Sequence, residues 1–173
     1  MIFLINPSGD FPLNDDWVYA KIVRTILNAD LHFRDGGNAN FVFQGFWGAA
    51  FCWFLGFSFN SLRLSTLVLG AAGIVSFYGL ARKLQAPPFL AVTMTATLMS
   101  NPFYLGLAHT FMTDVPFTAM VIISLLFSAR YFAENKKMDL ALGFLFAFLS
   151  LGIRQYGLIF IFALSFACMI HWR

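Results

Sequence analysis

The sequence predicts an all-α fold, a polytopic transmembrane helical bundle with interfacial amphipathic helices in its first outward loop. Hydrophobic residues make up 60% of the 173 positions and charged residues only 11%, whereas soluble domains carry roughly 25% charge. The apolar residues gather in long stretches, and the basic residues lie mostly near the ends of those stretches. Because about 20 apolar residues cross the hydrocarbon core as a helix, this pattern is typical of an integral membrane protein.

We expect one membrane domain over residues 1–173, as a fragment of a longer polytopic protein. Residues 1–9 are expected to be the end of a truncated first helix, because Met1–Ile5 resembles the last turns of an apolar helix. No signal peptide is expected, since this stretch is too short for its apolar region. Residues 14–57 are expected to form an outward loop with two interfacial helices. Residues 60–173 then hold about five transmembrane helices of roughly 20 residues or fewer.

The outward loop begins with an expected amphipathic helix over Asn14–Asp30. Asn14 is its expected N-cap, and two carboxylates follow in the first turn, where the helix dipole favours negative charge. Its apolar and polar side chains fall on opposite faces, so it is expected to lie flat on the lipid surface. The apolar face consists of Val18, Ile22, Val23, Ile26 and Leu27. Phe46–Phe57 is aromatic but too short for a span, which favours a second interfacial helix.

Five apolar stretches follow as the expected spans. The last two are shorter than a full crossing. Either they cross where the bilayer is locally thin, or Arg154-Gln155 lies in a re-entrant break. The five stretches are Leu62–Leu80, Pro87–Ala108, Val115–Phe132, Leu140–Ile153 and Gly157–Ile170.

Basic residues predict the orientation of the bundle. Arg82-Lys83, Lys136-Lys137 and Arg173 fall at alternate loops, so the positive-inside rule places all three on the cytoplasmic side. The same rule accounts for the net charge of +3, and no nucleic-acid partner is expected. Five residues whose side chains can take part in catalysis or binding are then expected on the outward face: Asp15, Asp16, His109, Asp114 and Arg154.

Asp114 is the only formally charged residue between Ala86 and Ala129. A carboxylate at the bilayer centre costs about 2.5 to 3.5 kcal/mol on insertion scales, so such residues usually face a polar cavity or an interfacial loop. Pro116 and Asn101-Pro102 favour the loop. Asp114 also suits the N-cap of a helix beginning at the next residue, and capping does not exclude a function.

Carboxylates and an arginine on one membrane face suit transfer from a phosphate leaving group. A carboxylate can take the proton from an attacking hydroxyl, and a guanidinium can stabilise charge on the departing phosphate. Each residue also has a plainer interpretation: Asp15 and Asp16 complement the helix dipole, and Arg154 reaches the interface or pairs with a helix C-terminus. His109 is a candidate substrate contact, and it has no matching set of metal ligands.

Two segments resemble the membrane glycosyltransferases of the GT-C superfamily, family 39 type, which includes protein mannosyltransferases and aminoarabinose transferases. They are residues 11–20, FPLNDDWVYA, and residues 111–117, FMTDVPF. The resemblance implies an inverting transferase that moves a hexosyl or pentosyl group from a polyprenyl-phosphate donor to an acceptor at the outer membrane face. It implies two interfacial helices between the first two spans.

The resemblance also implies roles for single residues. Asp15 corresponds to the catalytic base and Asp16 to its acidic partner, so both are candidate catalytic residues. Asp114 corresponds to the acidic residue of the second outward loop. Arg154 lies where relatives carry a basic residue for the lipid phosphate, although many of them have Lys-Gly in place of Arg154-Gln155.

The implied partners are membrane lipid and the polyprenyl-phosphate sugar. A divalent metal ion is the one cofactor suggested. The implied protein is a multi-pass protein of a bacterial inner membrane. The alternative is a transporter or channel segment in which Asp114 and Arg154 are pathway charges deep in the membrane. A third alternative is a structural subunit whose acidic residues only cap helices. The depth of Asp114 separates the first two, because the enzyme requires it at the interface.

Overall fold

The computed structural model describes residues 9–13, 15–28 and 40–171. Within these ranges the chain is all-α, without a strand. Most of the expected helix end over 1–9, and the expected N-cap Asn14, lie outside the described residues. The helices are α1 (Asp16–Leu27), α2 (Val42–Leu55), α3 (Phe59–Lys83), α4 (Pro88–Ser100), α5 (Pro102–Ala108), α6 (Asp114–Glu134), α7 (Lys137–Leu151) and α8 (Gly157–His171).

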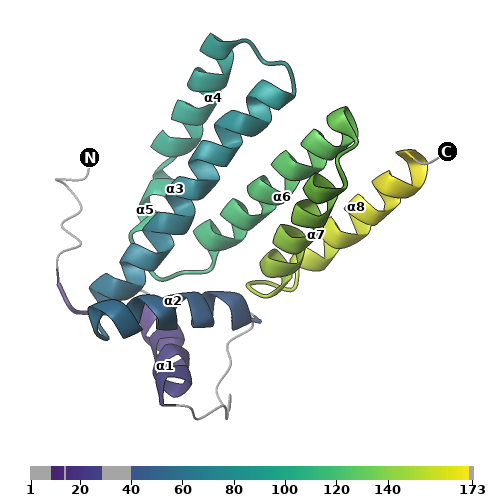
Figure 1. Ribbon diagram of the computed structural model, residues 1–173. Helices are drawn as coiled ribbons and strands as arrows, with labels where there is room; N and C mark the ends of the chain where they lie inside the picture. The colour runs from purple at the N-terminus through teal and green to yellow at the C-terminus, as the bar shows by residue number, and fades with distance from the viewer. Residues whose placement is uncertain (1–8, 14, 29–39, 172–173) are drawn as a thin grey trace.

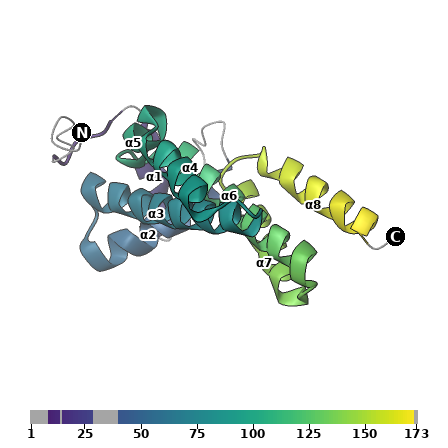
Figure 2. The ribbon, with the colours of Figure 1, turned by 90° about the horizontal axis from the view of Figure 1, so that it is seen from above.

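The helices form a bundle with a cross-layer at one end. Figure 1 shows α3, α6 and α8 running away from the end where α2 lies, whereas α7 and, along α3, the successive helices α4 and α5 run back towards it. Helix α2 lies across the lower end of these helices, and α1 packs beyond it. From above, α8 stands at the edge of the bundle (Figure 2). We call the end that carries α1, α2 and the segments 109–113 and 152–156 the site end.

Two of the described helices, α3 and α6, are long and apolar enough to cross a membrane. They have 25 and 21 residues, with mean hydropathies of 1.8 and 1.6 over their apolar windows. They contain the expected spans Leu62–Leu80 and Val115–Phe132. Helices α7 and α8 have 15 residues each, fewer than the roughly 20 of a full span, and they enclose the turn that holds Arg154-Gln155.

The expected second span, Pro87–Ala108, is divided into two helices rather than forming one. Asn101 has extended backbone angles, φ −60° and ψ 122°, as expected for a residue before proline. Its side chain accepts hydrogen bonds from the amides of Phe103 and Tyr104, at 2.9 and 3.2 Å. Asn101 therefore ends α4 and caps α5, and the break lies within an apolar stretch.

Close packing of α3 on α6 depends on a glycine. A Cβ atom at Gly73 would lie 2.9 Å from the Cβ of Ala119 and 3.0 Å from its Cα. Small residues at such a crossing let two backbones approach closely, as in membrane helix pairs. Beside this crossing, Leu69, Met120 and Ile123 form a buried apolar cluster with Ile153 from the α7–α8 turn.

Helices α1 and α2 share a second apolar cluster at the site end. The inner face of α1 contributes the buried Ala20 and Val23, which pack with Cys52 of α2 and with Phe111. Both expected interfacial helices are therefore present as helices, although α2 begins and ends earlier than the expected Phe46–Phe57. It ends where Gly56 takes a φ of 82°, a conformation that glycine adopts without steric cost.

The basic loops meet at the opposite end, which we call the basic end. Glu134 accepts hydrogen bonds from Lys83 at 2.5 Å and from Lys136 at 2.6 Å. This exposed cluster joins the end of α3 to the α6–α7 turn. The pairs Arg82-Lys83 and Lys136-Lys137 therefore lie at one end, as the orientation prediction requires, and Arg173, the third basic group of that prediction, lies outside the described residues.

Candidate functional site

Asp15 immediately precedes α1 and is exposed. Its side chain makes no capping hydrogen bond to the helix. Of the two neighbouring carboxylates, Asp15 is therefore the one that a solute at the site end can reach.

Asp16 is fully buried, with 0% of its surface exposed. Its Oδ1 accepts a hydrogen bond from the Phe111 amide at 2.9 Å, and its Oδ2 accepts one from the Leu13 amide at 3.4 Å. Burial raises the pKa of Asp16, although these two amides and the charge of Arg63 oppose the rise, and Asp15 adds to it. The carboxylate thus joins the start of α1 to the segment 109–113.

The separation of the two carboxylates follows from helix geometry. Asp16 occupies the same face of α1 as the buried Ala20 and Val23, at spacings of four and seven residues. The preceding residue is turned by about 100° from that face, because a helix has 3.6 residues per turn. This spacing was the signal in the sequence that could have identified Asp16 as the inward carboxylate.

Asp114 and Arg154 lie together. Arg154 Nη2 is 3.0 Å from Asp114 Oδ2, and Arg154 Nε donates to Thr113 Oγ1 at 2.7 Å. Both charged side chains are partly exposed, 38% for Asp114 and 29% for Arg154. The pair connects the first residue of α6 to the α7–α8 turn.

This geometry corrects two plainer interpretations. Asp114 is the first residue of α6, and the N-cap position belongs to Thr113, which makes no capping bond with its side chain. The expectation that Asp114 is the N-cap is therefore wrong, although its charge still complements the helix dipole. Arg154 pairs with a carboxylate rather than with a helix C-terminus.

His109 follows α5 and belongs to the same segment. Its Nδ1 lies 2.8 Å from the Leu105 carbonyl oxygen, so the ring is held against its own helix. Among the residues that the structure describes, no group of three or more His, Cys, Asp or Glu side chains is arranged to hold a metal ion. Two of the carboxylates already have partners, since Asp16 accepts from two backbone amides and Asp114 pairs with a guanidinium.

Gln44 of α2 was not identified from the sequence as a site residue. It is fully buried, and its Nε2 donates to the carbonyl oxygens of Met112 at 3.1 Å and Phe111 at 3.5 Å. Its Oε1 is buried without a hydrogen-bond partner within the described ranges. The available signal was one amide side chain in the otherwise apolar helix VFQGFWGAAFCWFL.

Arg63 of α3 is a second residue that sequence reasoning missed. It is 3% exposed and donates to the carbonyl oxygens of Gly9 and Phe11. In return, Asp10 accepts a hydrogen bond from the Phe59 amide at 2.7 Å, at the start of α3. The chain preceding Asp15 is thereby fixed to α3, and the available signal was a single arginine in an apolar stretch.

Helix α2 also holds the α7–α8 turn. The Phe43 amide donates to the Gly152 carbonyl at 3.0 Å, and the Phe41 amide donates to the Ile153 carbonyl at 3.3 Å. Asn40 donates to the Leu151 carbonyl at 2.9 Å. The turn that carries Arg154 is therefore attached to the same layer as the segment 109–113.

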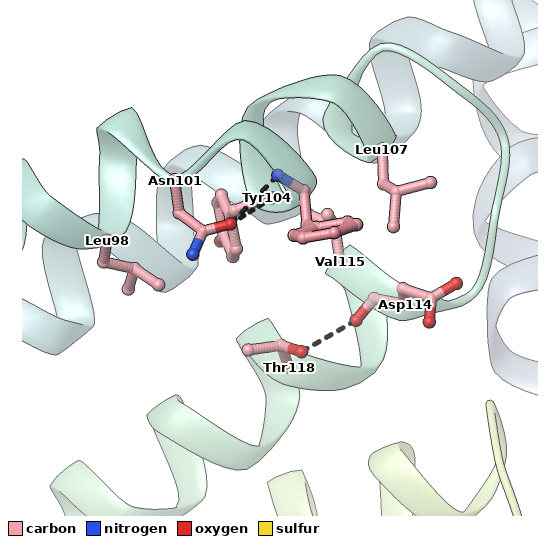
Figure 3. Close-up of a pocket in the computed structure, with 8 residues that line it drawn as sticks. Leu98, Asn101, Tyr104, Leu107, Asp114, Val115 and Thr118 are labelled. Carbon is pink, nitrogen blue, oxygen red and sulfur yellow. Dashed lines mark hydrogen bonds between the residues drawn. The ribbon is translucent and has the colours of Figure 1, made fainter.

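A mainly apolar cavity of about 350 Å³ lies between α4–α5 and α6, beside Asp114. In Figure 3, Asn101 and Asp114 stand at opposite sides of the labelled group, and the Asp114 carboxylate points away from Asn101. The charged group therefore lies at the border of the cavity. The lining residues are Leu98, Asn101, Phe103, Tyr104, Leu107, Asp114, Val115 and Thr118.

The chain matches no protein-family model, no curated protein and no solved structure. At the site end, an accessible carboxylate, a carboxylate–guanidinium pair and an apolar cavity lie on segments that buried side chains hold together. Such an arrangement can bind an anion, accept a proton and accommodate an apolar chain.

Proposed function

We propose that this chain belongs to a multi-pass membrane glycosyltransferase of the GT-C type, which transfers a sugar from a polyprenyl-phosphate donor to an acceptor hydroxyl or amine. One observation carries the proposal. The buried Asp16 binds the Phe111 amide, and so attaches the exposed Asp15 to the segment that leads into the Asp114–Arg154 pair. The two acidic segments of the resemblance, almost one hundred residues apart, thus share one end of the bundle.

Asp15 is the proposed catalytic base. Its carboxylate takes the proton from the acceptor while the acceptor oxygen or nitrogen attacks the anomeric carbon. The bond from that carbon to the phosphate oxygen breaks, and the electron pair leaves with the polyprenyl phosphate. General base catalysis of this kind contributes about 10²- to 10⁴-fold in rate.

Arg154 is the proposed phosphate-binding residue. It already holds an anionic oxygen of Asp114 at 3.0 Å, so its guanidinium is oriented for an oxyanion. A phosphate oxygen can occupy further N–H groups of this guanidinium, because arginine presents five donors in a planar fork. In this role Asp114 orients Arg154. The guanidinium then stabilises the negative charge that develops on the phosphate as it leaves.

The cavity beside Asp114 supports an amphiphilic donor. Its lining is mostly apolar, and Asp114, whose carboxylate pairs with Arg154, lies at its border. A polyprenyl chain is apolar and its phosphate is anionic, so one molecule can satisfy both surroundings. The site lies at the end of two helices of membrane-spanning length, which supports a donor whose phosphate sits at a bilayer surface.

The position of Asp114 favours the transferase over the transporter alternative. Pathway charges in transporters lie near the bilayer midplane, often at broken helices. Asp114 instead begins α6 and pairs with Arg154 in the turn between α7 and α8. Both groups are therefore at a helix end, as an interfacial site requires.

The test is transfer of radiolabelled sugar in proteoliposomes, with undecaprenyl-phosphate mannose and undecaprenyl-phosphate aminoarabinose as donors. We expect Asp15→Asn to lower the transfer rate by about 10²-fold or more. Asp10→Asn is the matched control, because it removes the same charge from the same loop and keeps an oxygen for the Phe59 amide. Equal rates in the two variants would overturn the proposal.

A further inference from the structure

We infer that Asp16 is a positioning residue, which holds the segment 109–113 so that the Asp114–Arg154 pair stays in register with Asp15. The inference rests on the proposed function for the roles of those three residues. It differs from the expectation that Asp16 is itself a catalytic residue. Asp16 instead holds the segment 109–113 in position by accepting a hydrogen bond from the Phe111 amide.

The first step concerns access to Asp16. The residue is 0% exposed, and each of its two oxygens accepts an amide hydrogen bond. A substrate would have to displace both amides to reach the carboxylate. A buried carboxylate that accepts from two backbone amides holds those two backbone segments in place, because its removal leaves both N–H groups without an acceptor.

The second step connects Phe111 to the charged pair. Phe111 is fully buried in the apolar cluster shared by α1 and α2, and only one residue separates it from Thr113. The Thr113 hydroxyl accepts from Arg154 Nε at 2.7 Å. A shift of Phe111 is therefore transmitted along a short stretch of backbone to one of the two groups that orient Arg154.

The third step is an independent attachment of the same segment. Gln44 donates to the carbonyls of Phe111 and Met112, while Asp16 accepts from the Phe111 amide. Two different helices thus hold the amide and carbonyl sides of one residue. Preorganisation of this kind keeps a binding group in place without a cost at the moment of reaction.

The chemistry of the side chain explains why a carboxylate suits this position. A carboxylate offers acceptors on both oxygens and no donor, which matches two amides. In Asp16→Asn the amide oxygen can still accept from Phe111, but the amino group faces the Leu13 amide, which is also a donor. In Asp16→Ala both amides lose their acceptor.

Hydrogen–deuterium exchange of the full chain in nanodiscs tests the positioning directly. In Asp16→Ala we expect exchange to become about tenfold faster at the Phe111 amide and also faster in 152–156, while amides of α3 and α6 stay protected. Asp15→Asn, the adjacent carboxylate, should change neither segment. Unchanged exchange at Phe111, or a change there without one in 152–156, would overturn the inference.

Asp16→Asn keeps the test decisive if Asp16→Ala does not fold. Because asparagine retains the acceptor for Phe111, exchange should accelerate at Leu13 and stay within about threefold of wild type at Phe111. Acceleration at both amides to the same extent, or at neither, would contradict the assigned hydrogen bonds. This graded rescue by the conservative variant is not expected of a residue that only fills space.

Binding of sugar-free undecaprenyl phosphate supplies the second readout. We expect Asp16→Ala to weaken it about tenfold and Asp16→Asn by less than about threefold, with Asp10→Asn unchanged. Equal affinity in Asp16→Ala and wild type would refute the coupling to Arg154. If wild type itself does not bind this lipid, the proposed function fails, and the exchange experiment still decides whether Asp16 positions the segment.

Discussion

The two ends of the bundle both carry ion pairs, but their buried polar groups bind different partners. At the basic end the buried Asp139 pairs with the side chain of Arg130, whereas buried side chains at the site end bind backbone groups of a distant segment. At the basic end, Lys83 and Lys136 share Glu134 in an exposed cluster. At the site end, the Asp114–Arg154 pair continues into Thr113 and, along the backbone, to the buried Asp16 and Gln44. Exposed ion pairs contribute little to stability, whereas buried polar groups make rigid, specific contacts.

This difference indicates what each end does. Charges at the basic end suit the orientation of the helices in a membrane, which depends on the presence of Lys and Arg more than on their contacts. Charges at the site end have fixed partners and a fixed backbone beneath them. A substitution should therefore have effects that depend strongly on which end it alters.

The largest expected effect on stability is that of Asp16→Ala. The substitution leaves the Phe111 amide buried without an acceptor, and an unsatisfied buried donor costs about 1 to 3 kcal/mol. We expect the free energy of unfolding to fall by that amount, measured by thermal or denaturant unfolding in detergent. Glu134→Gln at the basic end is the comparison, and an equally large loss there would remove the distinction between the two ends.

A smaller loss is expected for Gln44→Leu. The substitution removes the donor to the Met112 carbonyl, but it also removes the buried Oε1, which has no partner within the described residues. Removing an unpartnered buried atom is favourable, so the two effects partly cancel. We expect a loss of about 1 kcal/mol or less in the same unfolding assay, and a loss equal to that of Asp16→Ala would show that Gln44 is the principal attachment.

How far the sequence predicts this molecule differs between the fold and the site. Helices α3 and α6 were predictable because an apolar stretch of about 20 residues has few other solutions. The division at Asn101-Pro102 was harder to place, since the surrounding residues are apolar on both sides of it. Local hydropathy there indicates a continuous span, while the proline ends the helix.

In the site, the charged residues could be identified from the sequence, but the hydrogen bonds that hold the site together could not. Asp114 and Arg154 stand out as isolated charges, and the structure brings them within 3.0 Å. Gln44 and Asp16 bind backbone groups 68 and 95 positions away in the chain. Because every residue has a backbone carbonyl and every residue except proline has a backbone amide, such a partner leaves no trace in residue type.

The affinity for a lipid phosphate, and its dependence on salt, should distinguish Arg154 at the site end from a lysine at the basic end. We expect undecaprenyl phosphate to bind at least tenfold more weakly to Arg154→Ala than to wild type, as loss of a charge-assisted pair predicts, roughly 1.4 kcal/mol. Lys137→Ala at the basic end is the charge-matched control. Raising the salt concentration should weaken binding to wild type more than the residual binding to Arg154→Ala, and identical salt dependence in both proteins would show that Arg154 does not hold the phosphate.

The smallest expected effect is on the pH dependence of stability. The contributions of Asp16 at the site end and of Lys136 at the basic end both fall as pH rises, the first in the acid range and the second in the alkaline range. Burial raises the pKa of Asp16 above its ordinary value of 3.8, so its contribution to stability is fully present below that value and is lost as pH rises through the folded-state pKa. The hydrogen bond to Glu134 raises the pKa of Lys136 above 10.5, and its contribution is lost only as pH rises beyond that value. Melting temperatures of wild type should therefore fall relative to Asp16→Asn as pH rises from about 4, and relative to Lys136→Gln only in the alkaline range. A wild-type protein that instead gained stability over Asp16→Asn in the acid range would show that the two amides outweigh the burial of Asp16.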